Sequence, residues 1–204
     1  MNFDQFSILL GAGAALLVGV SKTGMPGLAI PAVVMMAEAF PDDARLSVGA
    51  LLPVLILGDL FALAWYRRHA QWDRLWHLCP FVVLGMIPGY VVLTWIDPAG
   101  LRVLLGTLVL ALLALEMYRR RSRWFHEPHR GWFTATAGVL AGFGTTVGNA
   151  AGPVMSIYLV GSRLDKHELI GTAAWFFFLV NVSKIPIFCA SGMITGSSAS
   201  KALS

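Results

Sequence analysis

Charged residues are scarce in this sequence: Asp, Glu, Lys and Arg make up 13% of its 204 residues, and hydrophobic residues make up 57%. A typical soluble domain has about a quarter of its residues charged. The mean hydropathy of +0.71 agrees with the composition. These values exclude a soluble domain and predict an all-α polytopic membrane protein whose main partner is the lipid bilayer. Most basic residues lie in short loops between the apolar segments, so we expect no nucleic-acid partner.

Cysteine and enzyme motifs are also missing or rare. Cys79 and Cys189 lie in apolar segments without a CxxC spacing, so we expect neither a disulfide nor a metal site. The sequence has no HExxH, GxSxG or P-loop pattern, and we expect no catalysis, no ATP hydrolysis and no cofactor. No Lys or Arg precedes Lys22, so the basic region of a cleavable signal peptide is missing and the first apolar segment should remain as a span.

Six apolar segments are long enough to cross a bilayer, which takes about 20 helical residues. They cover residues 5–38, 46–66, 75–95, 99–118, 131–160 and 168–190. The first and fifth are too long for one span and are interrupted by Gly and Pro, at 19–31 and 142–153. Irregular backbone persists in a bilayer only where it is buried or lines a wet cavity. Two interrupted helices at matching positions therefore predict a solute site between them.

The two interruptions belong to a weak internal repeat. A shift of 122 residues aligns Pro31 with Pro153, Asp43 with Asp165, Arg45 with His167, Gly49 with Gly171, and Asp59 with Asn181. We therefore predict a first repeat over 1–118, a basic loop over 119–130, and a second repeat over 131–204 that lacks the last two spans of the first. Copies with an even number of crossings would share one orientation, whereas a re-entrant segment would invert one of them.

Basic loop residues predict the orientation of the chain. If every segment crosses once, one face carries Arg67, Arg68, Arg74, Arg119, Arg120, Arg121, Arg123, Arg130 and Lys201, and the other carries Arg45, Arg102, Arg163 and Lys166. Lys and Arg accumulate in cytoplasmic loops. On that premise the N-terminus is cytoplasmic, in a multi-pass protein of the inner membrane.

Two lysines lie within apolar segments, where a cation costs at least about 2.5 kcal/mol and usually marks function. Lys22 lies in the first interruption, where it either binds a solute or pairs with Asp59. Lys184 lies one turn from Asn181 and either snorkels to the surface or joins the site. Half-helix ends at the interruptions favour anions. The predicted substrate-binding residues are Lys22, Gly24, Gly27, Thr145, Thr146, Gly148, Asn149, Gly152 and Lys184.

Asp59 is the only carboxylate deep in a predicted span, and its counterpart in the repeat is the amide Asn181. This pair suits proton coupling, but Asp59 is equally well explained as a static partner of Lys22. A permease of the same build for another solute, even a cation bound by Asp59, is a second hypothesis. A non-transporting assembly subunit is a third, and a homo-oligomer is left open.

Taken together, these patterns resemble the TauE/SafE family of sulfite and organosulfonate exporters. The resemblance rests on Gly24, Gly27 and Pro31, on Asp43-Ala44-Arg45 with Gly49, on Gly142-Phe143-Gly144 through Gly148, Gly152 and Pro153, and on Gly171-Thr172. It implies a bacterial-type permease of two homologous four-span halves that exports a small sulfur-containing anion across the cytoplasmic membrane. The last two spans of the family pattern are missing here.

Overall fold

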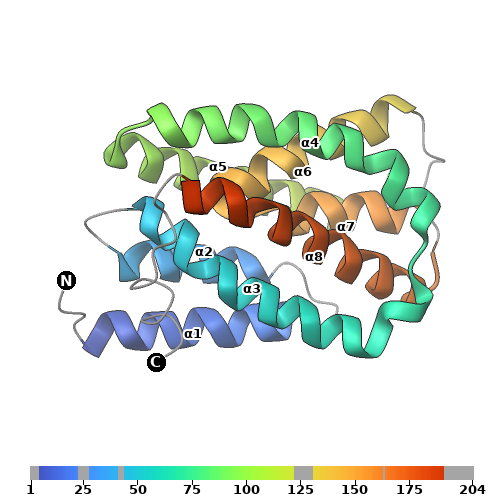
Figure 1. The fold of residues 1–204 in the computed structure, drawn as a ribbon, viewed down its shortest axis with the longest axis horizontal. Helices are drawn as coiled ribbons and strands as arrows, with labels where there is room; N and C mark the ends of the chain where they lie inside the picture. Colours follow the sequence, from blue (N-terminus) through green and yellow to red (C-terminus); the bar gives the residue numbers. More distant parts are fainter. Residues whose placement is uncertain (1–4, 23–27, 41–43, 122–130, 163, 191–204) are drawn as a thin grey trace.

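The computed structural model describes residues 5–22, 28–40, 44–121, 131–162 and 164–190, and these residues form a bundle of helices (Figure 1). The elements are α1 (Gln5–Ser21), α2 (Ala29–Ala39), α3 (Ala44–Tyr66), the 3₁₀ turn η2 (Arg67–His69), α4 (Trp72–Trp95), α5 (Pro98–Arg121), α6 (Gly131–Gly148), α7 (Gly152–Gly161) and α8 (Lys166–Ala190). No strand occurs in these ranges, so the predicted all-α class is confirmed.

Three stretches are long and apolar enough to cross a bilayer by themselves. They are Arg45–His69, Trp72–Trp95 and Lys166–Cys189. Large apolar side chains such as Leu9, Phe61 and Val103 remain exposed on the bundle surface, each at about 70% of its full area. Because lipid covers such side chains without cost, the exposed surface agrees with the predicted membrane protein.

The first interrupted segment is a helical hairpin. Gly13 in the middle of α1 lies against Met35 near the end of α2. A continuous helix would hold these two residues about 33 Å apart, at 1.5 Å per residue. Because the chain turns back between α1 and α2, the segment 5–38 enters and leaves at one end of the molecule. The premise that it crosses once is therefore wrong.

The second interrupted segment is a hairpin that points the opposite way. Along α6, Gly138 faces the carbonyl of Leu78 and Thr146 packs on Gly89, so α6 runs parallel to α4. Five residues after α7 ends at Gly161, α8 begins at Lys166, next to the start of α4. It follows that α7 returns toward the end at which α6 entered. Figure 1 shows α6 and α7 on the side of the bundle opposite to α1 and α2.

The helices α3 and α8 pack against each other and lie antiparallel. Asp59 of α3 contacts Asn181 of α8 near the middle of both helices. Toward the end of α3, the carbonyl of Arg67 accepts a hydrogen bond from Trp175, which lies closer to the start of α8. The order of contacts is therefore reversed between the two helices, as it must be for an antiparallel pair.

The helix bounds follow the predicted shift of 122 residues. Added to α2 (29–39) and α3 (44–66), the shift gives 151–161 and 166–188, which closely match α7 (152–161) and α8 (166–190). The series α1–α2–α3 also runs in the direction opposite to α6–α7–α8 (Figure 1). These observations support the predicted repeat and favour its inverted form over the parallel one.

Close packing of α6 on α4 depends on Gly142. A Cβ atom at this position would overlap the main chain of Val82. We expect Gly142→Ala to cost roughly 1–3 kcal/mol of stability, the usual cost of overpacking, and to lower the melting temperature of the detergent-purified protein. Gly106→Ala on α5 is the matched control, because its Cβ would meet nothing within 4 Å. Equal losses in the two variants would contradict this account.

Candidate functional site

The tips of the two hairpins meet in the centre of the molecule. Ser21 and Lys22, at the end of α1, face Asn149 and Gly152, which flank the break between α6 and α7. Together with Ala29, the first residue of α2, they line a hollow of about 30 Å³. Both returning helices, α2 and α7, therefore begin at this hollow. Their N-terminal ends place two positive dipole ends on one space.

Lys22 is held at the hollow by a buried carboxylate. Its Nζ atom lies 2.6 Å from Oδ1 of Asp59, and the side-chain exposures are 12% and 0%. The other carboxylate oxygen, Oδ2, accepts a hydrogen bond from Nδ2 of Asn181 at 2.7 Å. The ammonium also lies over the ring of Phe177, 4.4 Å from its centroid, in the geometry of a cation–π contact. Lys22 is thus positioned by neighbours while a part of its surface stays accessible.

Lys184 has a different environment. It is fully buried, and its Nζ atom donates hydrogen bonds to the carbonyl and the hydroxyl of Thr145, each at 3.1 Å, and to Oδ1 of Asn149 at 2.6 Å. The residues lining the central hollow do not include it. A direct contact between Lys184 and a solute therefore stays a prediction that this geometry does not favour.

Asn149 fixes the shape of the second break. Its φ of 53° is in the left-handed region, which Asn tolerates better than most residues. The amide Nδ2 donates to the carbonyl of Val48 on α3 at 2.9 Å. The next residue, Ala150, donates its backbone N–H to the carbonyl of Gly144 at 3.0 Å. The break is consequently a well-bonded turn, tied to α3 and, through Lys184, to α8.

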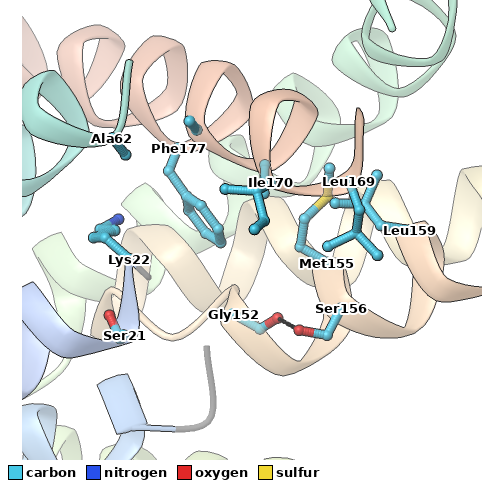
Figure 2. Close-up of a pocket in the computed structure, with 12 residues that line it drawn as sticks. Ser21, Lys22, Ala62, Gly152, Met155, Ser156, Leu159, Leu169, Ile170 and Phe177 are labelled. Carbon is cyan, nitrogen blue, oxygen red and sulfur yellow. Dashed lines mark hydrogen bonds between the residues drawn. The ribbon is translucent and has the colours of Figure 1, made fainter. Parts of the chain in front are cut away.

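A second hollow of about 50 Å³ extends from Lys22 between α7 and α8. Figure 2 shows Lys22 at one end of this space and Leu159 and Leu169 at the other, with Phe177 close to the ammonium. Leu159 lies near the end of α7 and Leu169 near the start of α8. A single water needs about 10–15 Å³ on this measure. The space has room for a few water molecules or for a small solute, and it leads from the centre of the bundle toward one of its ends.

The formal charges of the central residues sum to one positive charge. Lys22 and Lys184 each count as one positive charge, and Asp59 is the only acidic residue among the described side chains that these two lysines contact or adjoin. Both hollows include Lys22 in their lining, and neither includes Asp59. A solute in this space therefore meets a cation and helix N-termini, which favours an anion.

Not every predicted site residue lies at the hollows. The structure brings Lys22, Thr145, Asn149, Gly152 and Asn181 to them, with Asp59 and Lys184 close by. Thr146 instead packs on Gly89 of α4, and Gly148 faces leucines of α5. This geometry does not favour these two assignments, because the helical turn of α6 directs adjacent residues to different neighbours. Gly24 and Gly27 lie outside the described residues.

Sequence reasoning missed Phe177 and Ser21. Phe177 lies one helical turn before Asn181, so the same-face spacing of four residues would have identified it. Ser21 lies next to Lys22 and donates its hydroxyl to the carbonyl of Val18 at 2.7 Å. Nothing in its sequence context distinguishes it from an ordinary helix-end serine.

Comparisons with known proteins identify the family of the chain. The family model described as sulfite exporter TauE/SafE matches residues 7–202, nearly the whole sequence. Comparisons with curated proteins and with solved structures give no match. The resemblance inferred from the glycine-rich interruptions is confirmed. The chain belongs to the sulfite exporter TauE/SafE family and is a membrane transporter of that family.

Proposed function

We propose that this protein is a permease that exports a small anion, sulfite or a related sulfur-containing organic anion, across the cytoplasmic membrane. The observation that carries the proposal is Lys22, an ammonium group at mid-depth that faces a hollow between two hairpin tips. The sulfur chemistry of the solute comes from the family alone.

The chemistry of the hollow suits anion binding. An anion that leaves water needs replacement for its hydration shell, and charge-assisted hydrogen bonds are the strongest ones available. Lys22 supplies such a donor, and the α2 and α7 N-termini at Ala29 and Gly152 add favourable dipoles. The combined space of about 50 Å³ and about 30 Å³ limits the solute to a few heavy atoms.

Basic residues mark one end of the bundle, here called the basic end, where α3 ends, α4 begins, α5 ends and α8 begins. The described helices place Arg67, Arg68, Arg74, Arg119, Arg120, Arg121 and Lys166 there, and Arg45 and Arg102 at the opposite end. By the positive-inside rule the basic end is cytoplasmic. Because α1 starts at the opposite end, we propose an N-terminus outside the cytoplasm, in place of the orientation that assumed a single crossing.

The larger hollow leads toward the basic end. It is lined by one face of α8, which carries Leu169, Ala173 and Phe177, and all three side chains are only half-buried. The corresponding face of α3 carries Ser47, Leu51 and Leu55, which are 2–5% exposed. Two of these three, Leu51 and Leu55, pack against α1 and α2. The α1–α2 hairpin therefore packs closely on α3, whereas the α6–α7 hairpin leaves a space beside α8.

This difference suggests how the solute crosses. We propose that transport exchanges the conformations of the two inverted halves, so that the α3 face opens outward as the α8 face closes. In the state seen here the site receives its anion from the cytoplasm, which is the direction an exporter requires.

Asp59 limits how strongly Lys22 holds an anion. In the resting site the carboxylate competes with the solute for the ammonium. We expect Asp59→Asn to lower KM for the anion roughly tenfold, the effect of about 1.4 kcal/mol, and to slow turnover because the bound anion leaves less readily. Initial rates of uptake at varied anion concentration measure both quantities. A raised KM would instead indicate that Asp59 only positions Lys22. The proton-coupling hypothesis for Asp59 stays a prediction.

The proposal is tested by flux into proteoliposomes that contain only this protein. Sulfite should be transported and should be competed by related sulfur-containing anions more strongly than by acetate or metal cations. The cation-permease hypothesis is not favoured, because Asp59 is fully buried and already paired with Lys22 and Asn181. Flux of a metal ion without anion flux would reverse this choice, and absence of any flux would favour the assembly-subunit hypothesis.

A further inference from the structure

We propose that Lys184 acts as a resident cation: its ammonium occupies an oxygen-lined site at the break between α6 and α7, and it positions that break without contacting the solute. The proposal goes beyond the anion site at Lys22, and one of its tests needs no knowledge of the solute.

The ligands of Lys184 form a complete set for an ammonium ion. A lysine ammonium has three N–H donors. The structure supplies three oxygen acceptors, two from Thr145 and one from Asn149, at 2.6–3.1 Å. The side chain is 0% exposed, and the residues lining the two central hollows do not include it. Its whole hydrogen-bonding capacity is therefore used within the protein.

All three of these acceptors are neutral, and this separates Lys184 from an ordinary ion pair. The nearby carboxylate of Asp59 is bound to Lys22 and Asn181 instead. The acceptors also lie at the C-terminal end of α6, where the helix dipole attracts positive charge. Interrupted helices in transporters use such carbonyl and side-chain oxygens to coordinate a coupling cation. In this protein a tethered ammonium fills the corresponding place.

The site is connected to moving parts of the proposed cycle. Asn149 accepts from Lys184 through Oδ1 and donates through Nδ2 to the carbonyl of Val48. A single amide thus joins α8 to α3 across the break. Removal of the ammonium leaves the oxygens of Thr145 and Asn149 buried without their cation, and the left-handed turn at Asn149 loses its support.

The test is chemical rescue of Lys184→Ala by small amines. We expect this variant to melt at a lower temperature than the wild type and to lose at least about tenfold in flux, the effect of 1.4 kcal/mol. Methyl-, ethyl- or propylammonium should bind in the vacated space and restore both quantities in a saturable manner. Tetramethylammonium, which has no N–H donor, should not. The wild type should show no amine dependence and no Na⁺ dependence.

A double variant and a second single variant complete the test. Lys184→Ala combined with Asn149→Ala removes one oxygen ligand and should abolish amine rescue. If Lys184→Ala does not fold, Asn149→Ala alone, which keeps the lysine, should still lower the melting temperature and the flux. Full activity in either single variant would overturn the proposal. The proposal would also be overturned if primary amines do not raise the melting temperature of purified Lys184→Ala protein. The melting temperature is measured without solute. The effect of amines on it can therefore be interpreted even if the anion proposal fails.

Discussion

Replacement of Lys22 with Met is expected to reduce anion flux about a hundredfold, because one charge-assisted hydrogen bond contributes roughly 1.5–3 kcal/mol. Lys22 is the cation that lines both hollows, and Met provides an unbranched apolar side chain, one atom shorter, without the charge. The measurement is initial uptake of sulfite by proteoliposomes with equal protein content. Lys22→Arg keeps the charge and should retain part of the flux.

The same replacement leaves Asp59 buried without its ion-pair partner, which typically costs 3–5 kcal/mol. Loss of flux in Lys22→Met therefore has two possible origins, a missing anion site or a destabilised protein. The double variant Lys22→Met with Asp59→Asn separates them, because it removes both charges and lets Asn181 pair with a neutral amide. We expect it to recover thermal stability but not flux. Recovery of flux in the double variant would remove Lys22 from the anion site.

The second large effect concerns the α3 face and the α8 face, which we expect to open alternately during transport. In a background with Cys79 and Cys189 replaced by Ala, Ala173→Cys on α8 should react with a membrane-impermeant thiol reagent from the cytoplasmic side. Its counterpart in the repeat, Leu51→Cys on α3, should react from the opposite side only when the anion drives the exchange. We expect each rate to change at least about tenfold between the two states, as a population shift of 1.4 kcal/mol gives.

Leu101→Cys is the control for this measurement. Leu101 is 0% exposed near the start of α5, at the same end of the bundle as Leu51. It should stay unreactive in every condition. If Leu51→Cys does not fold, Leu55→Cys on the same face replaces it, with Phe177→Cys as its counterpart. Measurable flux combined with an unreactive α3 face would overturn the exchange of halves while leaving the anion proposal intact.

Local sequence patterns predicted many parts of this structure. Apolar runs located the helices, and Gly and Pro located both interruptions, because these residues have strong intrinsic effects on backbone conformation. The repeat shift paired Asp59 with Asn181, and the structure places the two side chains in direct contact at 2.7 Å. The pairing of Lys22 with Asp59, which was one of the two alternatives for Lys22, is present at 2.6 Å.

Other properties were beyond local patterns. A long apolar segment with a break has the same sequence pattern whether it crosses the membrane or turns back. The first hairpin was therefore identified only by the contact between Gly13 and Met35, and the proposed orientation depends on it. Thr145 and Thr146 are neighbours with the same chemistry, yet only Thr145 lines a hollow, because their places on the α6 helix differ.

The sequence by itself determined that this chain is a helical membrane protein with two interrupted segments and a few buried polar groups, because composition and backbone preference act locally. Only the tertiary structure decided which of the two lysines faces the hollow. Lys22 and Lys184 carry the same ammonium, and the difference arises from their surroundings: a buried carboxylate beside an open space for one, and three protein oxygens for the other. These surroundings come from residues far apart in the chain, which no local pattern encodes.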